Sequence, residues 1–179
     1  YHCRKHFLSS SKTRMKIHAI LKNISICCLA LMACRATAQT APPLSAGQSL
    51  YLPVYSHLYH GEFNSRTGKP SETLVSTHVS IRNTDPKLAI RVNSARYYDT
   101  EGKLLREYLP APKSIPPFGT HELFVPRSDS SGGSGANFVI DWSAERPANP
   151  PVVEALHADI REARTLIFVT TGQAIQPSR

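Results

Sequence analysis

The stretch TLVSTHVSIRN, residues 73–83, alternates apolar and polar side chains with a period of two. Successive side chains of a β-strand point to opposite faces of a sheet, so this alternation predicts a half-buried strand. The face predicted to be buried carries Val75, Thr77, Val79 and Ile81. The chain then reaches TDPK, residues 84–87, where aspartate and proline favour a turn.

Similar stretches lie on both sides of residues 73–83, with glycine, proline or charged turn residues between them. We predict further strands in residues 49–59, 89–98, 103–109, 120–126, 137–144, 152–160 and 165–172. About eight short strands at regular spacing are typical of an all-β protein. The expected fold is a single antiparallel β-sandwich, immunoglobulin-like or related, and a small barrel is the alternative.

Two of these strands carry further detail. In residues 89–98 the apolar phase changes after Ile90 and Val92, which predicts a β-bulge at residues 93–94. Residues 152–160 contain helix formers, but the alternation of their side chains suits a strand better. On a strand Val153, Ala155, His157 and Asp159 lie on one face. In residues 137–144 the shared phase of Phe138, Ile140 and Trp142 predicts three core side chains.

The N-terminal region has the layout of a secretory signal peptide. A short basic segment after Met15 precedes the apolar run ISICCLALMA, residues 24–33, and an Ala-x-Ala pattern follows it at Ala36 and Ala38. We therefore expect residues 1–14 to be an over-extended start and residues 15–38 to be the signal peptide. A flexible tether over residues 39–48 and one β-sandwich domain over residues 49–176 would follow. The expected location is periplasmic or secreted.

An alternative for the leader involves Cys34. The sequence LMAC, residues 31–34, has the leucine, the small residue and the cysteine of a bacterial lipoprotein signal, with Met32 as an unusual filler. In that interpretation Cys34 is lipidated and anchors the protein in the outer membrane, its single expected link to a membrane. All four cysteines precede Gln39, so cleavage after Ala38 would leave neither a disulfide nor a cysteine metal site.

The basic charge belongs to the leader. The whole chain has 21 Lys and Arg residues against 13 acids, but residues 1–38 hold seven of the cations and none of the acids. The rest of the chain, with 14 cations against 13 acids, is nearly neutral. Net charge therefore offers no support for a nucleic-acid partner.

The glycine-rich loop SDSSGGSG, residues 128–135, is the strongest candidate for a site. A nucleophilic Ser134 would need Gly-x-Ser-x-Gly before a helix, and a phosphate loop would need a helix N-terminus and usually a lysine. Neither context is present, so we interpret the stretch as a structural connection. Its candidate ligand-binding residues, for a weak anion or a partner, are Asp129, Gly133, Ser134, Gly135 and Asn137.

Other chemistry in the chain is weaker. His57 and His60 are three positions apart, so on a strand they point to opposite faces, and we expect neither a metal site nor a cofactor. Tyr51, Tyr55 and Tyr59 share a phase that could form an aromatic face for a glycan or a protein partner. The charged stretch REAR, residues 161–164, is interpreted as a solvated turn.

Five segments resemble one known family in this order: LPVYSHLYHG, VSIRNTD, YYDTEGKLLREYL, SGGSGANFVIDW and TGQAI. They are similar to the bacterial family called domain of unknown function 3124, over about Tyr51 to Ile175. The resemblance implies an envelope protein with a signal or lipoprotein leader, and it supplies no activity, cofactor or catalytic residue.

We therefore expect an exported, non-catalytic β-sandwich that binds or scaffolds an envelope protein or a glycan. The alternative is an envelope hydrolase that uses Ser134 or a histidine, and a histidine elsewhere in the chain could supply the base for Ser134. The histidines available to it after the leader are His57, His60, His78, His121 and His157.

Overall fold

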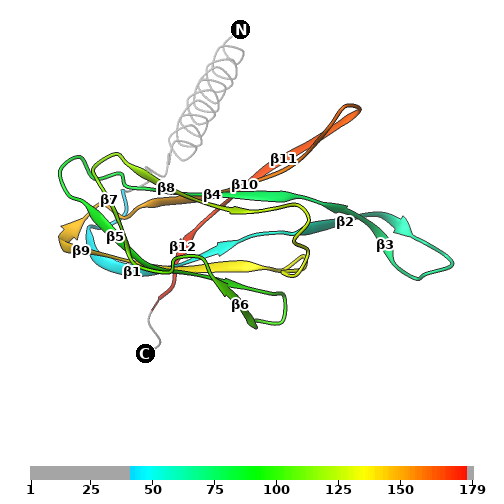
Figure 1. Cartoon of the computed structure of the whole chain (residues 1–179), viewed down its shortest axis with the longest axis horizontal. Coiled ribbons are helices and arrows are strands. Elements are labelled where there is room, and N and C mark those ends of the chain that lie inside the picture. Colours follow the sequence, from blue (N-terminus) through cyan, green and yellow to red (C-terminus); the bar gives the residue numbers. More distant parts are fainter. Residues whose placement is uncertain (1–40, 177–179) are drawn as a thin grey trace, which may run out of the picture. The chain divides into compact units, whose positions relative to one another are not determined.

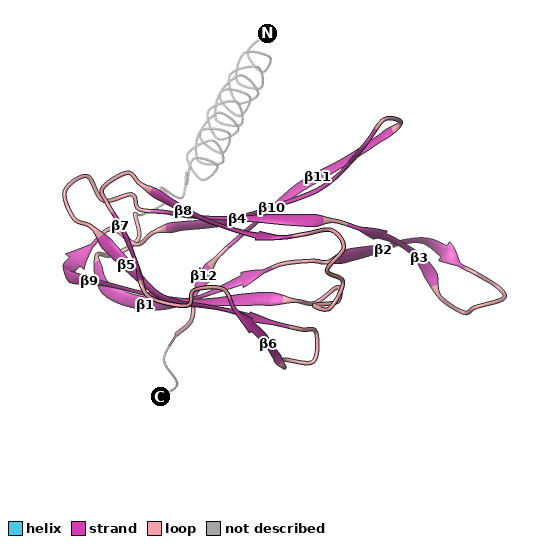
Figure 2. Ribbon diagram, in the orientation of Figure 1, coloured by secondary structure: helices cyan, strands magenta, loops and turns pink. Residues whose placement is uncertain are grey.

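A computed structural model describes residues 41–176 of the chain. The predicted signal peptide, Cys34 and the predicted over-extended start lie outside the described residues. Within them the chain forms β-strands and connecting loops (Figure 2). The strands are β1 (Ser45–Pro53), β2 (His57–Phe63), β3 (Pro70–Leu74), β4 (Ser76–Arg82), β5 (Ile90–Tyr98), β6 (Leu104–Glu107), β7 (Lys113–Ile115), β8 (Thr120–Val125), β9 (Asn137–Ala148), β10 (Val152–Arg161), β11 (Arg164–Thr171) and β12 (Gln173–Ala174).

All strand pairs are antiparallel, and they form three sheets. The six-stranded sheet has the order β12-β1-β9-β5-β6, with β7 also paired to β5. The four-stranded sheet has the order β11-β10-β4-β8, and β2 and β3 form a separate hairpin. The two larger sheets face each other as two layers, which is a sandwich-like arrangement (Figure 1).

One apolar core lies between the two larger sheets. From the six-stranded sheet, β9 contributes Phe138, Ile140 and Trp142, each at most 2 % exposed. From the four-stranded sheet, β4 contributes Val79 and Ile81, which are fully buried. The prediction that Trp142 is a core residue is confirmed. Burial of these alternating side chains holds the two layers together, because removal of apolar surface from water is the main driving force of folding.

Several local predictions are confirmed. Val75 and Thr77 are buried, as the alternation in residues 73–83 requires. The register between β5 and β9 shifts between Val92 and Ser94, which is the predicted bulge. β10 is a strand, as predicted. The face that carries Val153, Ala155, His157 and Asp159 is buried, at most 2 % exposed at every position.

The prediction of a single eight-stranded sandwich is wrong, since twelve strands in three sheets are present in residues 41–176. The first predicted strand is divided into β1 and β2, because the chain leaves the six-stranded sheet after Pro53 and begins a hairpin of its own. β1 begins at Ser45, earlier than expected, because Ser45 and Gly47 already pair with β9. β7 lies between two predicted strands, in a stretch where we predicted none. Three residues are too few to show a period, and their pairing with β5 makes them a strand.

Two hairpins extend from the same end of the described domain, as Figure 2 shows. One is β2–β3, and the other is the outer part of β10–β11. No helix in residues 41–176 is long and apolar enough to cross a membrane.

Candidate functional site

The glycine-rich loop connects β8 of the four-stranded sheet to β9 of the six-stranded sheet. Asp129 braces the loop through its carboxylate, which accepts hydrogen bonds from the backbone N–H and the hydroxyl of Ser131. Ser134 is half-buried at the turn. Asn137 is the first residue of β9, where its backbone pairs with Pro53 and Tyr98.

Backbone groups of this loop bind neighbouring segments. The carbonyl oxygen of Gly133 accepts hydrogen bonds from the backbone N–H and the hydroxyl of Ser56, at 3.1 and 2.9 Å. The carbonyl oxygen of Gly132 accepts two from Thr100, and the N–H of Gly135 donates to the Thr100 hydroxyl at 3.0 Å. The loop is therefore tied to two other connections.

Arg127 immediately precedes the glycine-rich loop. It belongs to a cluster of charged side chains centred on Asp159. Nε of Arg127 lies 3.2 Å from one carboxylate oxygen of Asp159, and Nε of Arg161 lies 3.0 Å from the same oxygen. Nη2 of Arg164 lies 2.8 Å from the other oxygen. The Asp159 side chain is 1 % exposed, whereas each arginine side chain is about half exposed.

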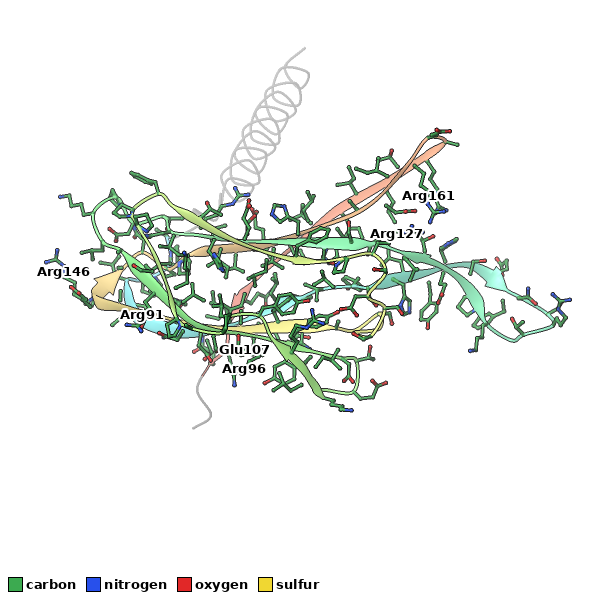
Figure 3. All side chains as sticks on the ribbon, viewed as in Figure 1. Arg91, Arg96, Glu107, Arg127, Arg146 and Arg161 are labelled. Carbon is green, nitrogen blue, oxygen red and sulfur yellow. The ribbon has the colours of Figure 1, made fainter. Side chains whose placement is uncertain are left out.

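The arginine cluster, defined as Arg127, Arg161 and Arg164, carries three positive charges against the single negative charge of Asp159. Hydrogen bonds from Arg161, followed by those from Arg164, hold the pKa of Asp159 below its usual value, so this carboxylate stays ionised at neutral pH. An arginine has five N–H donors, and these contacts with Asp159 use only some of them. Positive charge that Asp159 does not balance, and arginine N–H donors that Asp159 does not bind, therefore remain at the protein surface. Figure 3 shows Arg161 near the tip of the β10–β11 hairpin, with Arg127 below it in the view.

A cleft of about 380 Å³ lies next to the arginine cluster, between the two hairpins. One wall comes from β2 and β3, with Leu58, Tyr59, His60 and Thr73. The other wall comes from the start of β11, with Arg164, Thr165 and Leu166. Arg164 therefore belongs both to the cleft and to the arginine cluster. The His60 ring nitrogen Nε2 lies 3.0 Å from the Thr73 hydroxyl, which holds that ring in place.

A group of three aromatic rings lies on β10, on β11 and on the segment between β1 and β2. The rings of His157 and Phe168 are stacked with their centroids 4.4 Å apart, and Tyr55 contacts both rings edge-on. His157 Nε2 accepts a hydrogen bond from the backbone N–H of Tyr55 at 3.1 Å. Burial lowers the pKa of His157 to about 4, so the ring is neutral at neutral pH.

A larger groove, of about 780 Å³, lies elsewhere in the domain and includes Lys87, Arg91 and Glu145. Its labelled side chain, Arg91, is at the opposite end of the view from Arg127 and Arg161 (Figure 3). Its charges are of both signs, and no group of cations converges there on one buried acid as at Asp159. We therefore take the cleft between the hairpins as the candidate site.

The histidines are distributed over several environments. His57 is buried at the start of β2, and its Nδ1 lies 3.3 Å from the Ser56 hydroxyl. His78 on β4 pairs with Glu122 on β8, with 3.3 Å between His78 Nε2 and the Glu122 carboxylate. Within residues 41–176, no group of three or more His, Cys, Asp or Glu side chains could hold a metal ion.

The cleft and the arginine cluster were not predicted from the sequence. REAR is an exposed turn, as interpreted, and its two arginines also bind Asp159, Arg161 from the same strand and Arg164 from β11. A signal was present, because Asp159 shares a strand face with the apolar Val153 and Ala155, and an apolar face of a strand is the one expected to be buried. A buried carboxylate needs cationic or hydrogen-bonding partners, and the nearest cations in sequence are those of REAR.

Comparison with known proteins identifies the family to which this chain belongs. One solved structure, "Crystal Structure of Thermotoga maritima 1070", aligns with a TM-score of 0.40 at 12 % identity, covering 73 % of this chain and 97 % of that chain. No curated protein matches the chain. The sequence profile described as "Protein of unknown function (DUF3124)" matches residues 47–175. This confirms the resemblance seen in the sequence, and the chain belongs to the DUF3124 family.

Proposed function

We propose that this protein is an exported, non-catalytic binding protein of the bacterial envelope, and that the cleft between its two hairpins holds a small organic anion. The proposal is carried by one observation. Three half-exposed arginines converge on one buried carboxylate at the edge of the cleft, which leaves an excess of positive charge there. Guanidinium groups bind carboxylates and phosphates well because their planar N–H donors match the geometry of those anions.

The size and the lining of the cleft indicate what kind of molecule carries the anionic group. Its volume is within the range of small-molecule sites, roughly 300–1,000 Å³. Leu58 and Leu166 offer apolar contact, while Thr73 and Thr165 offer hydroxyl groups. The ligand class that fits is a carboxylate or phosphate joined to an apolar or aromatic body.

We propose export because of the N-terminal leader sequence. The basic segment, the apolar run and the Ala-x-Ala pattern support cleavage after Ala38, with lipidation of Cys34 as the alternative. The test is the mass of the N-terminal peptide after expression in a bacterium. We expect a chain that begins at Gln39, whereas a lipid on Cys34 would support the anchored form. An uncleaved chain in the cytoplasm would contradict export.

Binding of the anion is tested with a matched pair of probes, 4-phenylbutyrate and 4-phenylbutanol. They share an apolar body and differ in charge, so titration calorimetry should detect the acid and a much weaker interaction with the alcohol. Arg164→Gln should weaken binding of the acid by about tenfold or more, because a hydrogen bond between charged groups contributes about 1.5–3 kcal/mol. Arg91→Gln, in the other groove, is the control and should leave binding unchanged. Equal binding of both probes, or equal effects of the two variants, would contradict the proposal.

A hydrolase remains the alternative. The serine that contacts a histidine is Ser56, with His57, and Ser56 is 1 % exposed, so a substrate could not reach its hydroxyl without a conformational change. Ser134, the serine predicted as the nucleophile, is half-buried in the loop. We expect a fluorophosphonate probe to leave the protein unlabelled, and labelling of Ser134 or Ser56 would favour the hydrolase.

A further inference from the structure

β11 is an edge strand of the four-stranded sheet. It pairs with β10 over its whole length, from Arg164 to Thr171, with no shift of register. Its other edge has no strand partner among residues 41–176. Natural proteins usually protect such edges with charges, prolines or bulges, or keep them very short. From Thr165 to Thr171 this strand has none of those protections.

The outward face of the same hairpin is apolar and exposed. Ile167 and Val169 on β11 are 52 % and 53 % exposed, and Leu156 and Ile160 on β10 are 40 % and 70 % exposed. Leu156 is paired directly with Val169, so these side chains form one surface that reaches the unpaired edge. We call these four residues the hairpin apolar face. Adjacent apolar side chains of this size on a surface are typical of an interaction site.

We propose that two copies of this chain pair their β11 strands antiparallel about a twofold axis near Ile167. The two four-stranded sheets would then form one continuous sheet, and the two hairpin apolar faces would adjoin. Ile167 would lie opposite the partner's Ile167, with Leu166 opposite the partner's Phe168. The axis lies at Ile167 because this residue is at the middle of β11, so that pairing about it uses almost the whole strand, from Arg164 to Thr170.

The distribution of charge favours a second copy as the occupant. Arg164 is the single charged residue of β11 and lies at its first position. In the antiparallel pair it lies opposite the partner's Thr170, and the two Arg164 residues are roughly 20 Å apart at about 3.4 Å per residue. That exceeds the Debye length of about 8 Å at physiological ionic strength. A parallel pair would place them side by side, and like charges opposite one another are destabilising. The strand is therefore self-complementary in one orientation.

The first test is the oligomeric state of the intact protein without added ligand, by sedimentation at about 50 μM, where a dimer with a micromolar Kd is populated. We expect a dimer. Ile167→Lys should weaken association at least about tenfold, because it places two cations opposite each other at the axis. Phe124→Lys is the matched control, since Phe124 is a similarly exposed apolar residue on β8, the other edge of the same sheet. It should leave the dimer intact.

A second variant tests the register. Ile167→Cys introduces a thiol into a stretch, residues 35–179, that has no cysteine. Mild oxidation should convert this variant into a covalent dimer, whereas Val152→Cys, exposed at the far end of β10, should stay uncrosslinked. Circular dichroism checks that each variant is folded. A monomeric parent protein, a dimer unaffected by Ile167→Lys, or loss of the dimer in Phe124→Lys alone would overturn the proposal. Because no ligand is present, these outcomes are independent of the anion-binding test.

Discussion

The hydroxyl of Ser56 donates a 2.9 Å hydrogen bond to the carbonyl oxygen of Gly133, 77 positions further along the chain. This bond joins the start of the β2–β3 hairpin to the glycine-rich loop. The loop resembles a catalytic or phosphate-binding stretch in the sequence, yet backbone groups of its glycines are used here to join segments of the protein.

The first prediction concerns hydroxyl groups in this region. Ser56→Ala should lower the free energy of unfolding by about 1 kcal/mol, because one hydrogen bond is lost in a buried place. Ser134→Ala should change it by less than about 0.5 kcal/mol, as for ordinary surface substitutions. Urea denaturation of both variants measures the difference. A larger loss for Ser134→Ala than for Ser56→Ala would contradict the structural role of the loop.

The second prediction concerns the glycines of the same loop. A Cβ atom on Gly132 would overlap the Tyr97 hydroxyl, so Gly132→Ala should destabilise the fold by about 1–3 kcal/mol. Gly133 has a φ of 76°, and Gly133→Val should cost about 1–2 kcal/mol because this region is strained for branched residues. Gly102→Ala is an informative control: its φ is also positive, but its Cβ would meet nothing within 4 Å. If Gly132→Ala is no worse than Gly102→Ala, the close packing against Tyr97 is not important.

The third prediction concerns Trp142, which is 2 % exposed in the core. Trp142→Ala should lower stability by about 3–5 kcal/mol, the usual range for emptying such a site. Trp142→Phe should cost clearly less, because it keeps an aromatic ring and removes an indole N–H that has no hydrogen-bond partner among the described residues. Denaturant titration checks both values. If the two variants lose equal stability, the fit of the indole ring, and not the apolar area it buries, determines the contribution of this position to stability.

The fourth prediction concerns pH. The pKa of His157 is lowered to about 4 in the fold, against about 6.5 in an unfolded chain, so the unfolded state binds the proton first. Stability should therefore be full above about pH 6.5, fall as the pH decreases toward 4, and level off below it. The loss attributable to this residue should be about 3 kcal/mol.

The contribution of His157 is isolated by His157→Gln, which keeps an acceptor for the Tyr55 N–H and removes the titration. Unfolding of both proteins is followed at several pH values. The variant should show a smaller loss of stability between pH 6.5 and pH 4 than the parent protein. Parallel pH profiles would mean that His157 is protonated in the fold as readily as in the unfolded chain.

The fifth prediction concerns Asp159. Asp159→Asn removes the negative charge that holds the arginine cluster together, so the variant should have a lower Tm than the parent protein. Sulfate should raise the Tm of the variant more than that of the parent, because it can replace the missing charge between the guanidinium groups. Sodium chloride at the same ionic strength is the control for screening. An identical response to sulfate and chloride would argue against an anion-binding role for these arginines.

Most of the strands could be predicted because their signal is local. Alternation placed Val79 and Ile81 on one face of β4, and a change of phase located the bulge in β5, since side-chain direction in a strand has a period of two. The failures occur where the sequence carries no local signal. β7 is too short to show a period, and Ser45–Gln48, with small or polar side chains, become a strand only through pairing with the distant β9.

The sequence by itself determined an all-β chain with Trp142 and its neighbours in the core, because burial of alternating apolar residues dictates which face of each strand points inward. It also placed Asp159 on the same face of its strand as Val153 and Ala155. Only the tertiary structure decided what surrounds that carboxylate. Arg127 reaches it from the loop after β8, and Arg164 reaches it across the β10–β11 pair. Such contacts depend on which strands are neighbours and in which register, and the packing of the whole core sets both.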